Sequence, residues 1–317
     1  MRRNIHHGVS GGATYQDTNG IPHAVEGEMT PVVRVIGWLI TGMLLAAVLT
    51  GLWRGMNSHQ GFIADVVNGL KASEVGFAIA LILLGSIVEG FGYGLSLGTR
   101  WPYTRNIAVL MVRGDPEAAH RLVATLVGLV ALALVILSPS ITTISGLSLI
   151  VVTALFGMGT LYVLAGRAPA FVHGTHGLLA YGVFLVYLTG LVYPGLDFWS
   201  YLRAVGALHA LLLAVFLGGM TTGQRGFGTA IGAFVKPQKA SQWTIAAHVS
   251  AALLLVATLG WMMPAYPVAF YLAVTQVAVG FLLFHAVNLK PRDPGVMVVF
   301  HQSMVLLMSL AIVLQWR

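Results

Sequence analysis

Long apolar runs separated by short polar segments make up most of the chain. None of the runs alternates with the period of a β-strand, and backbone in lipid must satisfy its hydrogen bonds within its own segment, so helices rather than barrel strands are predicted. A helix needs roughly 20 apolar residues to cross a bilayer. Nine runs reach this length, at 32–53, 74–98, 118–137, 146–165, 170–193, 204–222, 242–263, 267–288 and 295–315.

The segment before the first run, residues 1–31, is polar and rich in glycine, and we expect it to form an N-terminal tail. The run that follows it starts too late and is too long for the core of a signal peptide. The sequence therefore predicts an uncleaved membrane anchor at 32–53.

The composition excludes a soluble protein. Apolar residues make up 57% of the chain and charged residues only 9%, and the mean hydropathy is +0.84, whereas a soluble surface needs about 25% charged residues. The net charge of +7 comes from basic residues that lie between the apolar runs. This pattern favours membrane lipids and anionic cofactors as partners, and not nucleic acid. The chain has no cysteine, which excludes disulfides, cysteine-bound zinc, iron–sulfur clusters and thiol catalysis.

The histidines indicate an internal repeat. After the first run, every second run carries a histidine near its start, namely His120, His176, His248 and His301. The first two are 56 residues apart and the last two 53, while the pairs are offset by 128 and 125 residues. A unit of four helices therefore occurs twice. Because each unit crosses the membrane an even number of times, the two units are predicted to be parallel repeats.

The fold predicted from this repeat is an all-α membrane protein of about nine spans. Two parallel-repeat four-helix transmembrane bundles occupy 74–193 and 204–317, and the extra N-terminal helix at 32–53 stands outside them. The four histidine-bearing helices run in the same direction, so their imidazoles are expected near one membrane face. Multi-pass insertion in a cell membrane, and specifically a prokaryotic plasma membrane, is the expected location.

Two neutral imidazoles that face each other inside a four-helix bundle are suited to be axial ligands of a haem iron. A single buried histidine is explained as well by a hydrogen bond to a neighbouring helix, but four at repeat-related positions favour ligands. Zinc is a weaker alternative, because it takes three or four ligands and no carboxylate set lies nearby. The sequence thus predicts haem sites at His120 with His176 and at His248 with His301.

Two carboxylates have alternative interpretations. Glu117 lies three residues before His120 and four before Arg121, so the three share one side of a helix. Glu117 either faces the histidine cavity, where it moves a proton or positions a substrate, or it pairs with Arg121 at a helix start. Glu89 is expected in the middle of a membrane helix, several residues from either end, where a carboxylate is a candidate functional group. Its alternative is a structural pairing with an Arg or His of the bundle.

The remaining histidines are expected to have other roles. His173 is the main rival of His176 as a ligand, because it lies only three residues away. His285 is predicted on the same face as the four histidines, with an interfacial position at the helix end as the favoured interpretation. His209 is predicted near the opposite face, and the others lie in the tail or a loop.

Basic residues are distributed unequally between the two ends of the predicted helices. Thirteen lie on the side of the N-terminus and four on the other side. The positive-inside rule places the first side, and the histidines with it, in the cytoplasm. Haem propionates are anionic and attract arginine, so a face that holds haem would collect basic residues for a chemical reason as well.

Several motifs resemble the haem A synthase family, the membrane enzymes that oxidise haem O to haem A. The resemblance covers roughly 75–317, and it depends on the order and spacing of the motifs together. They are Gly92-Tyr93-Gly94-Leu95-Ser96 followed by Trp101-Pro102, Glu117-Ala118-Ala119-His120-Arg121, His176-Gly177-Leu178-Leu179-Ala180, His248 with Ala252, Gln276-Val277-Ala278-Val279-Gly280 and Phe300-His301-Gln302.

The resemblance implies a b-type haem between His248 and His301, and a substrate haem near His120 and His176. It places Glu117 at the family's essential catalytic carboxylate. The implied reaction oxidises a methyl group of haem O to the formyl group of haem A, for use by terminal oxidases. Haem O is then the substrate, haem A the product, and haem O synthase or a terminal oxidase complex the expected protein partners.

The chain also departs from the family. It has an extra N-terminal helix, Val88-Glu89 stands where the family has Thr-Arg, and the cysteine pair of many members is absent. The family places its haem face outside the cytoplasm, in conflict with the charge distribution. These departures leave two alternatives: a non-catalytic dihaem b-type cytochrome that transfers electrons within a respiratory complex, and a transporter with parallel repeats.

Overall fold

The computed structural model describes residues 5–7, 13–16, 22–24, 49, 53, 56–57, 61–103, 106–226 and 228–316. The predicted helix at 32–53 lies outside the described residues except at Leu49 and Trp53. Within the predicted polar tail, three short strands form an antiparallel sheet, which the sequence pattern did not predict. They are β1 (Ile5–His7), β2 (Ala13–Gln16) and β3 (Pro22–Ala24).

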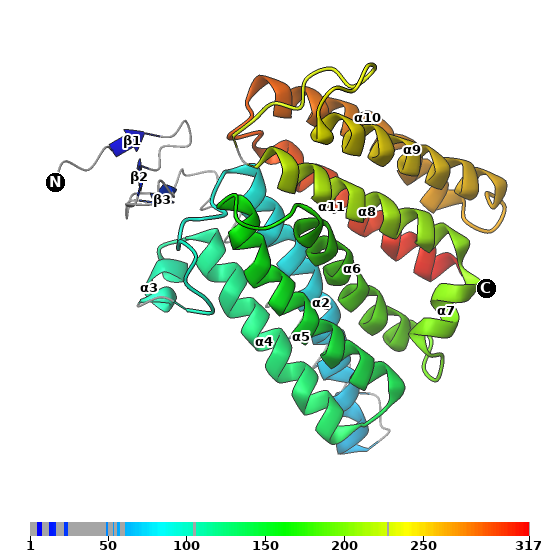
Figure 1. The fold of residues 1–317 in the computed structure, drawn as a ribbon. Helices are drawn as coiled ribbons and strands as arrows, with labels where there is room; N and C mark the ends of the chain where they lie inside the picture. The colour runs from blue at the N-terminus through cyan, green and yellow to red at the C-terminus, as the bar shows by residue number, and fades with distance from the viewer. Residues whose placement is uncertain are drawn as a thin grey trace.

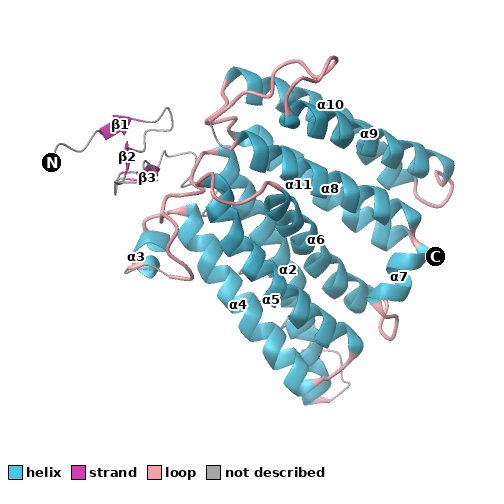
Figure 2. Cartoon of the chain, in the orientation of Figure 1, coloured by secondary structure: helices cyan, strands magenta, loops and turns pink. Residues whose placement is uncertain are grey.

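Ten helices follow in the described part of the chain, joined by short loops (Figure 2). Two of them, α3 and α7, are short. The helices are α2 (Phe62–Gly90), α3 (Ile107–Val112), α4 (Pro116–Leu137), α5 (Ile141–Leu164), α6 (Phe171–Val192), α7 (Phe198–Ala204), α8 (Gly206–Arg225), α9 (Ala240–Trp261), α10 (Pro267–Leu289) and α11 (Val296–Gln315).

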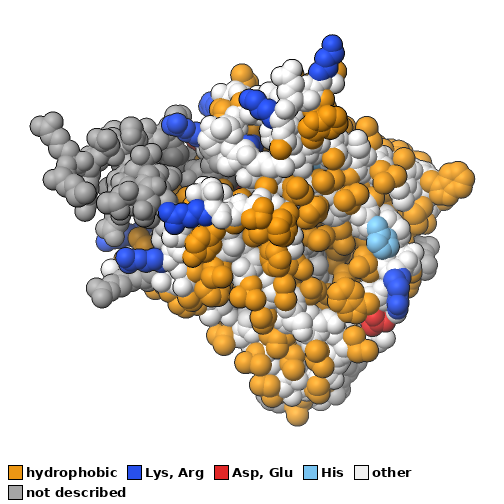
Figure 3. All heavy atoms as spheres, viewed as in Figure 1, with side chains coloured by type: hydrophobic (Ala, Val, Ile, Leu, Met, Phe, Trp, Pro, Cys, Tyr) orange, Lys and Arg blue, Asp and Glu red, His pale blue; other side chains and the backbone are white. Residues whose placement is uncertain are grey.

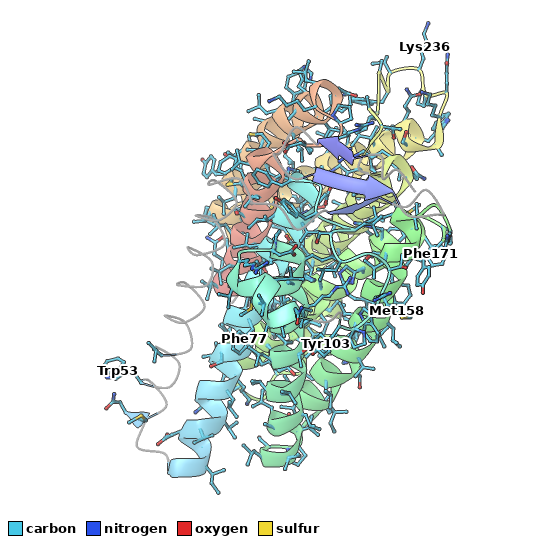
Figure 4. All side chains as sticks on the ribbon, turned by 90° about the vertical axis from the view of Figure 1, so that its left-hand side faces the viewer. Trp53, Phe77, Tyr103, Met158, Phe171 and Lys236 are labelled. Atoms are coloured by element: carbon cyan, nitrogen blue, oxygen red, sulfur yellow. The ribbon has the colours of Figure 1, made fainter. Side chains whose placement is uncertain are left out.

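The eight long helices make this a multi-pass membrane protein. Each is long and apolar enough to cross a bilayer. Hydrophobic side chains cover much of the face seen in Figure 3, while most of the Lys and Arg side chains visible there lie at the end that carries α3 and the loop before α9. Lys236 of that loop projects away from the helices (Figure 4). This is the surface that a protein in a lipid bilayer requires.

For description, the eight long helices are divided by chain order into a first set, α2, α4, α5 and α6, and a second set, α8, α9, α10 and α11 (Figure 1). In the first set, α2 packs on α4, α4 on α5, α5 on α6, and α6 on α2. In the second set, α8 packs on α9, α9 on α10, α10 on α11, and α11 on α8. The sets meet through α6 against α8 and α2 against α11, with a further contact between α6 and α11.

The centre of the molecule lies at α6, which contacts both sets. Eight consecutive residues of α6, 183–190, are buried all round, and Leu208 and Leu211 of α8 are buried beside them. A helix that is apolar on every side belongs in the interior of an assembly of helices. Helices α5, α9 and α10 instead expose many large apolar side chains, as expected of helices in contact with lipid.

The bounds of α2 differ most from the prediction of 74–98. The helix begins at Phe62 because the mixed polar segment before residue 74, which we interpreted as a loop, continues the helical path. It ends at Gly90 because Gly92 adopts a φ of 71°, which a helix does not allow. Gly90 lies so close to the backbone of Gly295 that an added Cβ would be 2.6 Å from the Gly295 oxygen.

Candidate functional site

The four predicted ligand histidines have similar surroundings, and we call the place of each ring against a glycine its seat. Each lies in the first turns of its helix, and one edge of its imidazole rests on a glycine of a neighbouring helix. A Cβ added to that glycine would lie 3.1–3.6 Å from the histidine Cε1. The pairs are His120 on Gly85, His176 on Gly157, His248 on Gly218 and His301 on Gly280.

In three of the seats a hydrogen bond holds Nδ1. The His176 Nδ1 is 3.0 Å from the Thr153 carbonyl oxygen, and the His248 Nδ1 is 2.8 Å from the Ala214 carbonyl oxygen. His301 differs, because the Gln276 amide nitrogen, 3.0 Å away, donates to its Nδ1 and so leaves the ring proton on Nε2. Nε2 of His301 can bind a metal only when the Gln276 amide is turned so that its Oε1, which has no partner in the described chain, accepts from Nδ1–H. Such contacts fix the orientation of a ligand ring and decide which nitrogen faces a metal.

The fourth seat is looser. His120 lies beside the backbone of Leu81, but its buried Nδ1 makes no hydrogen bond of normal geometry among the described residues. In all four seats the neighbour of Nδ1 is four positions before the glycine, which is one helical turn. These neighbours are Leu81, Thr153, Ala214 and Gln276, before Gly85, Gly157, Gly218 and Gly280.

The glycines explain why the rings can lie so close to the neighbouring helices. With Nδ1 and Cε1 directed at a helix backbone, Nε2 is the nitrogen left for another partner. Within the described chain, no hydrogen bond engages Nε2 of any of the four histidines, and each side chain keeps part of its surface accessible. The fold therefore orients Nε2 of His176, His248 and His301 without using it, whereas the ring of His120 is less firmly held.

The second pair has a spacing that suits one metal ion. The ring centres of His248 and His301 are 6.3 Å apart and their planes are inclined by 53°. Metal–imidazole bonds are about 2.0–2.1 Å long and a ring nitrogen lies about 1 Å from its ring centre, so an ion between two opposed imidazoles sets their centres roughly 6 Å apart. The observed distance agrees with this value.

The first pair is arranged differently. His120 and His176 lie within electrostatic range of each other, but their rings do not make the close contact found between His248 and His301. Among the described residues, no group of three or more His, Asp or Glu side chains lies close enough to hold a metal ion. Two imidazoles are therefore the most that either pair offers to a metal within the described chain.

Glu117 is engaged by the loop that precedes α4. Its Oε1 is 2.5 Å from Nη2 of Arg121, and its Oε2 accepts hydrogen bonds from the Ser96 hydroxyl at 2.7 Å and the Leu97 amide at 3.0 Å. Arg121 also donates to the carbonyl oxygen of Arg100. The pairing of Glu117 with Arg121 is thus present, and the carboxylate holds the loop of residues 96–100 against the start of α4.

Glu89 belongs to a polar cluster between the two helix sets. Its Oε1 accepts a hydrogen bond of 2.7 Å from the Thr222 hydroxyl, and it lies within electrostatic range of Arg225. The prediction of a mid-helix position was wrong, because α2 ends one residue later at Gly90. His173 also lies within electrostatic range of Arg225. We call Glu89, His173, Thr222 and Arg225 the inter-bundle cluster.

The remaining described histidines lie away from these groups. His209 is exposed on α8. His285 is exposed near the end of α10, and its ring packs on Phe281 with 4.4 Å between ring centres. An exposed ring at a helix end agrees with the interfacial position expected for His285.

Two buried groups were missed by the sequence analysis. Glu74 is completely buried in α2, and neither carboxylate oxygen has a hydrogen-bond partner within the described chain. Tyr187 of α6 lies within electrostatic range of it, and its hydroxyl is also without a partner there. Glu74 was placed at a helix start in the prediction, and only the longer α2 moves it to the middle of a helix.

Comparison with protein-family models, curated proteins and solved structures finds no match to this chain.

Proposed function

We propose that α2, α4, α5 and α6 form one repeat, that α8, α9, α10 and α11 form a second, and that each repeat holds a haem between two histidines. The common seats support the repeat, because histidine, glycine and Nδ1 neighbour correspond in both sets. The contacts between the sets also support the repeat. If α2, α4, α5 and α6 correspond in order to α8, α9, α10 and α11, the packing of α6 on α8 corresponds to the packing of α11 on α2, and both contacts are present.

We further propose that the protein is a haem-dependent membrane oxidoreductase resembling haem A synthase. In this proposal His248 and His301 would ligate a resident b-type haem, and His120 and His176 would receive haem O, whose methyl group is oxidised to the formyl group of haem A. That conversion removes four electrons and adds one oxygen atom, so it requires an external electron acceptor and water or dioxygen as the oxygen source. This proposal rests on the difference between the two histidine pairs. His248 and His301 are close and both anchored, whereas His120 lacks an anchoring hydrogen bond.

That difference is chemically useful. A resident cofactor benefits from two ligand rings held in advance, because second contacts of this kind raise metal affinity. A site that must release its product benefits from one ring that can move. When bound, the haem between His248 and His301 supplies one-electron redox chemistry. The protein's part is to orient the rings, exclude water and position the substrate.

Glu117 has a defined place in this proposal. It precedes His120 by one turn and closes the loop of residues 96–100 over the start of α4. Its carboxylate is available to position the substrate haem or accept a proton only when that loop opens. The loop is thus proposed as the cover of the substrate site, with haem O synthase or a terminal oxidase complex as the partner that exchanges haem there.

Pigment analysis of the purified protein tests the haem sites. We expect b-type haem in the wild type and its loss in His248→Ala and His301→Ala. His209→Ala is the matched control, because His209 is exposed on a helix of the same set. A wild type that is correctly inserted but colourless contradicts the proposal.

Co-expression with a source of haem O tests the reaction. We expect haem A from the wild type, and none from Glu117→Ala, which should retain its b-type haem. Ser96→Ala is the control for loop closure, since it removes one hydrogen bond to Glu117 and leaves the carboxylate. Equal loss of haem A in both variants would assign Glu117 a structural role only.

The second candidate is a dihaem b-type cytochrome. The observation in its favour is that all four histidines rest on glycines in the same way, as two permanent haems would require. It predicts two b-type haems per chain, retained through purification, and no haem A under any co-expression condition. A single retained b-type haem together with haem A production excludes it.

A further inference from the structure

The inter-bundle cluster contains an arginine with an unused donor. Arg225 is the last residue of α8 and only 5% exposed. Its Nη1 donates a hydrogen bond of 2.9 Å to the carbonyl oxygen of Pro291, while its buried Nη2 has no partner in the described chain. Glu89 is the nearest opposite charge named in the cluster, but it forms no ion pair with Arg225 within 4.0 Å and instead accepts from Thr222.

A second unused group lies beside it. The Nδ1 of His173 is buried and makes no hydrogen bond among the described residues, and His173 lies within electrostatic range of Arg225. The start of α6 and the end of α8 are pressed together here. A Cβ added to Gly223 would lie 3.0 Å from the His173 Cβ and 3.0 Å from the Ala170 oxygen.

Together, these two groups form a site suited to an anion. A guanidinium stays protonated in proteins, so Arg225 cannot avoid the cost of burial by losing its charge. An unpaired buried charge is strongly destabilising, whereas a carboxylate that accepts from Arg relieves that cost through short, charge-assisted hydrogen bonds. A neutral His173 with its proton on Nδ1 adds a donor. Because Arg225 is almost completely buried, the anion must reach it from inside the protein.

The position of Arg225 indicates the source of that anion. Arg225 follows Gly218, the seat of His248, by seven residues. Seven residues are two helical turns, so Arg225 is on the same side of α8 as the seat and about 10 Å nearer to the end of the helix. Arg225 therefore lies between the His248–His301 site and one end of the molecule. That end is the one at which α4, α6, α9 and α11, the four histidine-bearing helices, begin.

We propose that Arg225 and His173 bind a propionate carboxylate of the haem held by His248 and His301. The inference rests on the proposed haem site and goes beyond it by naming the anchor of the haem periphery. It also makes the site depend on both helix sets, since His173 belongs to α6 and Arg225 to α8.

The test compares haem b with its dimethyl ester, in which both propionates are uncharged. Apoprotein of the wild type, Arg225→Gln and Arg225→Lys is titrated with each compound in detergent, and the Soret band gives the affinity. Arg203→Gln is the control, because Arg203 is exposed and lies on α7 at the other end of the molecule. Insertion and folding of each variant are checked by its thermal transition.

We expect esterification to weaken binding to the wild type and to Arg203→Gln by about tenfold or more, as for loss of a hydrogen bond to a charged group. In Arg225→Gln the ester and the acid should bind almost equally, and Arg225→Lys should restore part of the difference. An ester effect of the same size in Arg225→Gln and wild type overturns the inference and leaves the haem site intact.

Two further outcomes are distinguished by the same samples. If neither compound binds the wild type, the proposed haem site itself fails, and this inference fails with it. If haem binds normally but Arg225→Gln abolishes retention of phosphatidylglycerol from mixed phosphatidylglycerol and phosphatidylcholine vesicles, the anion at Arg225 is a lipid phosphate and the propionate assignment is overturned.

Discussion

At the scale of single residues, the glycine seats decide how the histidines are presented. Gly218 touches His248 so closely that a Cβ would lie 3.2 Å from its Cε1 and 3.4 Å from its Nδ1. We expect Gly218→Ala to shift the ring off its hydrogen bond with Ala214 and to weaken haem binding roughly 10- to 100-fold. Gly128→Ala is the matched control, because nothing lies within 4 Å of its added Cβ. Equal pigment in both variants would contradict this role of the seat.

Under the proposed repeat, Glu74 and Tyr187 mark a difference between the two sets at corresponding positions. Glu74 precedes the seat Gly85 by 11 residues, and Tyr187 follows His176 by 11. In the second set, the residue 11 positions before Gly218 is Ala207, and the residue 11 positions after His301 is Ile312. Both are apolar and completely buried. The second set therefore packs this position without polar groups, so the fold does not require the carboxyl in the first.

We therefore expect Glu74→Leu to raise the stability of the protein. Removing a buried polar group that lacks partners relieves a cost of about 1–3 kcal/mol, and leucine matches the apolar surroundings. Thermal unfolding in detergent measures the shift, with Glu74→Gln as the control that stays polar. A lower transition temperature for Glu74→Leu would show that its carboxyl has a partner in the folded protein.

At the scale of elements, the start of α4 should respond to pH. Asp115 caps α4 by accepting from the Ala118 amide at 2.9 Å, and burial raises its pKa above the ordinary value of 3.8. An acid with a raised pKa binds its proton more tightly in the folded state. Its contribution to stability is therefore greatest at low pH, and it falls as the pH rises above about 3.8 through the raised pKa.

Asp115→Asn should remove this pH dependence. Asparagine caps helices as well as aspartate does, so the variant keeps the hydrogen bond to Ala118 and loses only the charge. We expect the wild type to lose thermal stability between acidic and neutral pH relative to Asp115→Asn, and the two curves to meet at low pH. Parallel curves over that range would show that Asp115 does not titrate there.

The positions of the elements followed from the sequence wherever apolar runs coincide with helices. Helix α6 was predicted at 170–193 and lies at Phe171–Val192, because its run ends abruptly at both sides. Helix α2 could not be bounded in this way. Its first turns carry polar residues such as Asp65 and Asn68, and hydropathy alone does not separate a polar helix start from a loop.

The candidate site was predictable only in part. Regular spacing of four histidines along the chain was sufficient to single them out as candidates, because spacing can be read from the sequence alone. The glycine seats and Nδ1 neighbours were not, since Gly85 and His120 meet only when α2 and α4 pack together. Arg225 was counted simply as a surface charge, and its burial depends on the contact between α8 and α6.

At the scale of the whole molecule, the distribution of charge bears on orientation. Arg121 and Arg225 are buried and occupied with internal contacts, so they do not act as topological signals. The other basic residues at the histidine end include Arg167, Lys236 and Lys239, which are exposed. The opposite end has Arg203 beside Asp197. Exposed positive charge therefore still favours a cytoplasmic histidine face.

Single cysteines can test this orientation, because the chain has none of its own. Arg167→Cys and Lys236→Cys place an exposed thiol at the histidine end, and Pro194→Cys and Ala265→Cys place one at the other end. We expect a membrane-impermeant maleimide added to intact cells to label only the second pair, and to label the first pair after the cells are opened. Labelling of Arg167→Cys and Lys236→Cys in intact cells would reverse the orientation and place haem exchange outside the cytoplasm. Labelling of one position from each pair would contradict the parallel arrangement itself, because two units of four crossings must present both of their histidine ends on one side of the membrane.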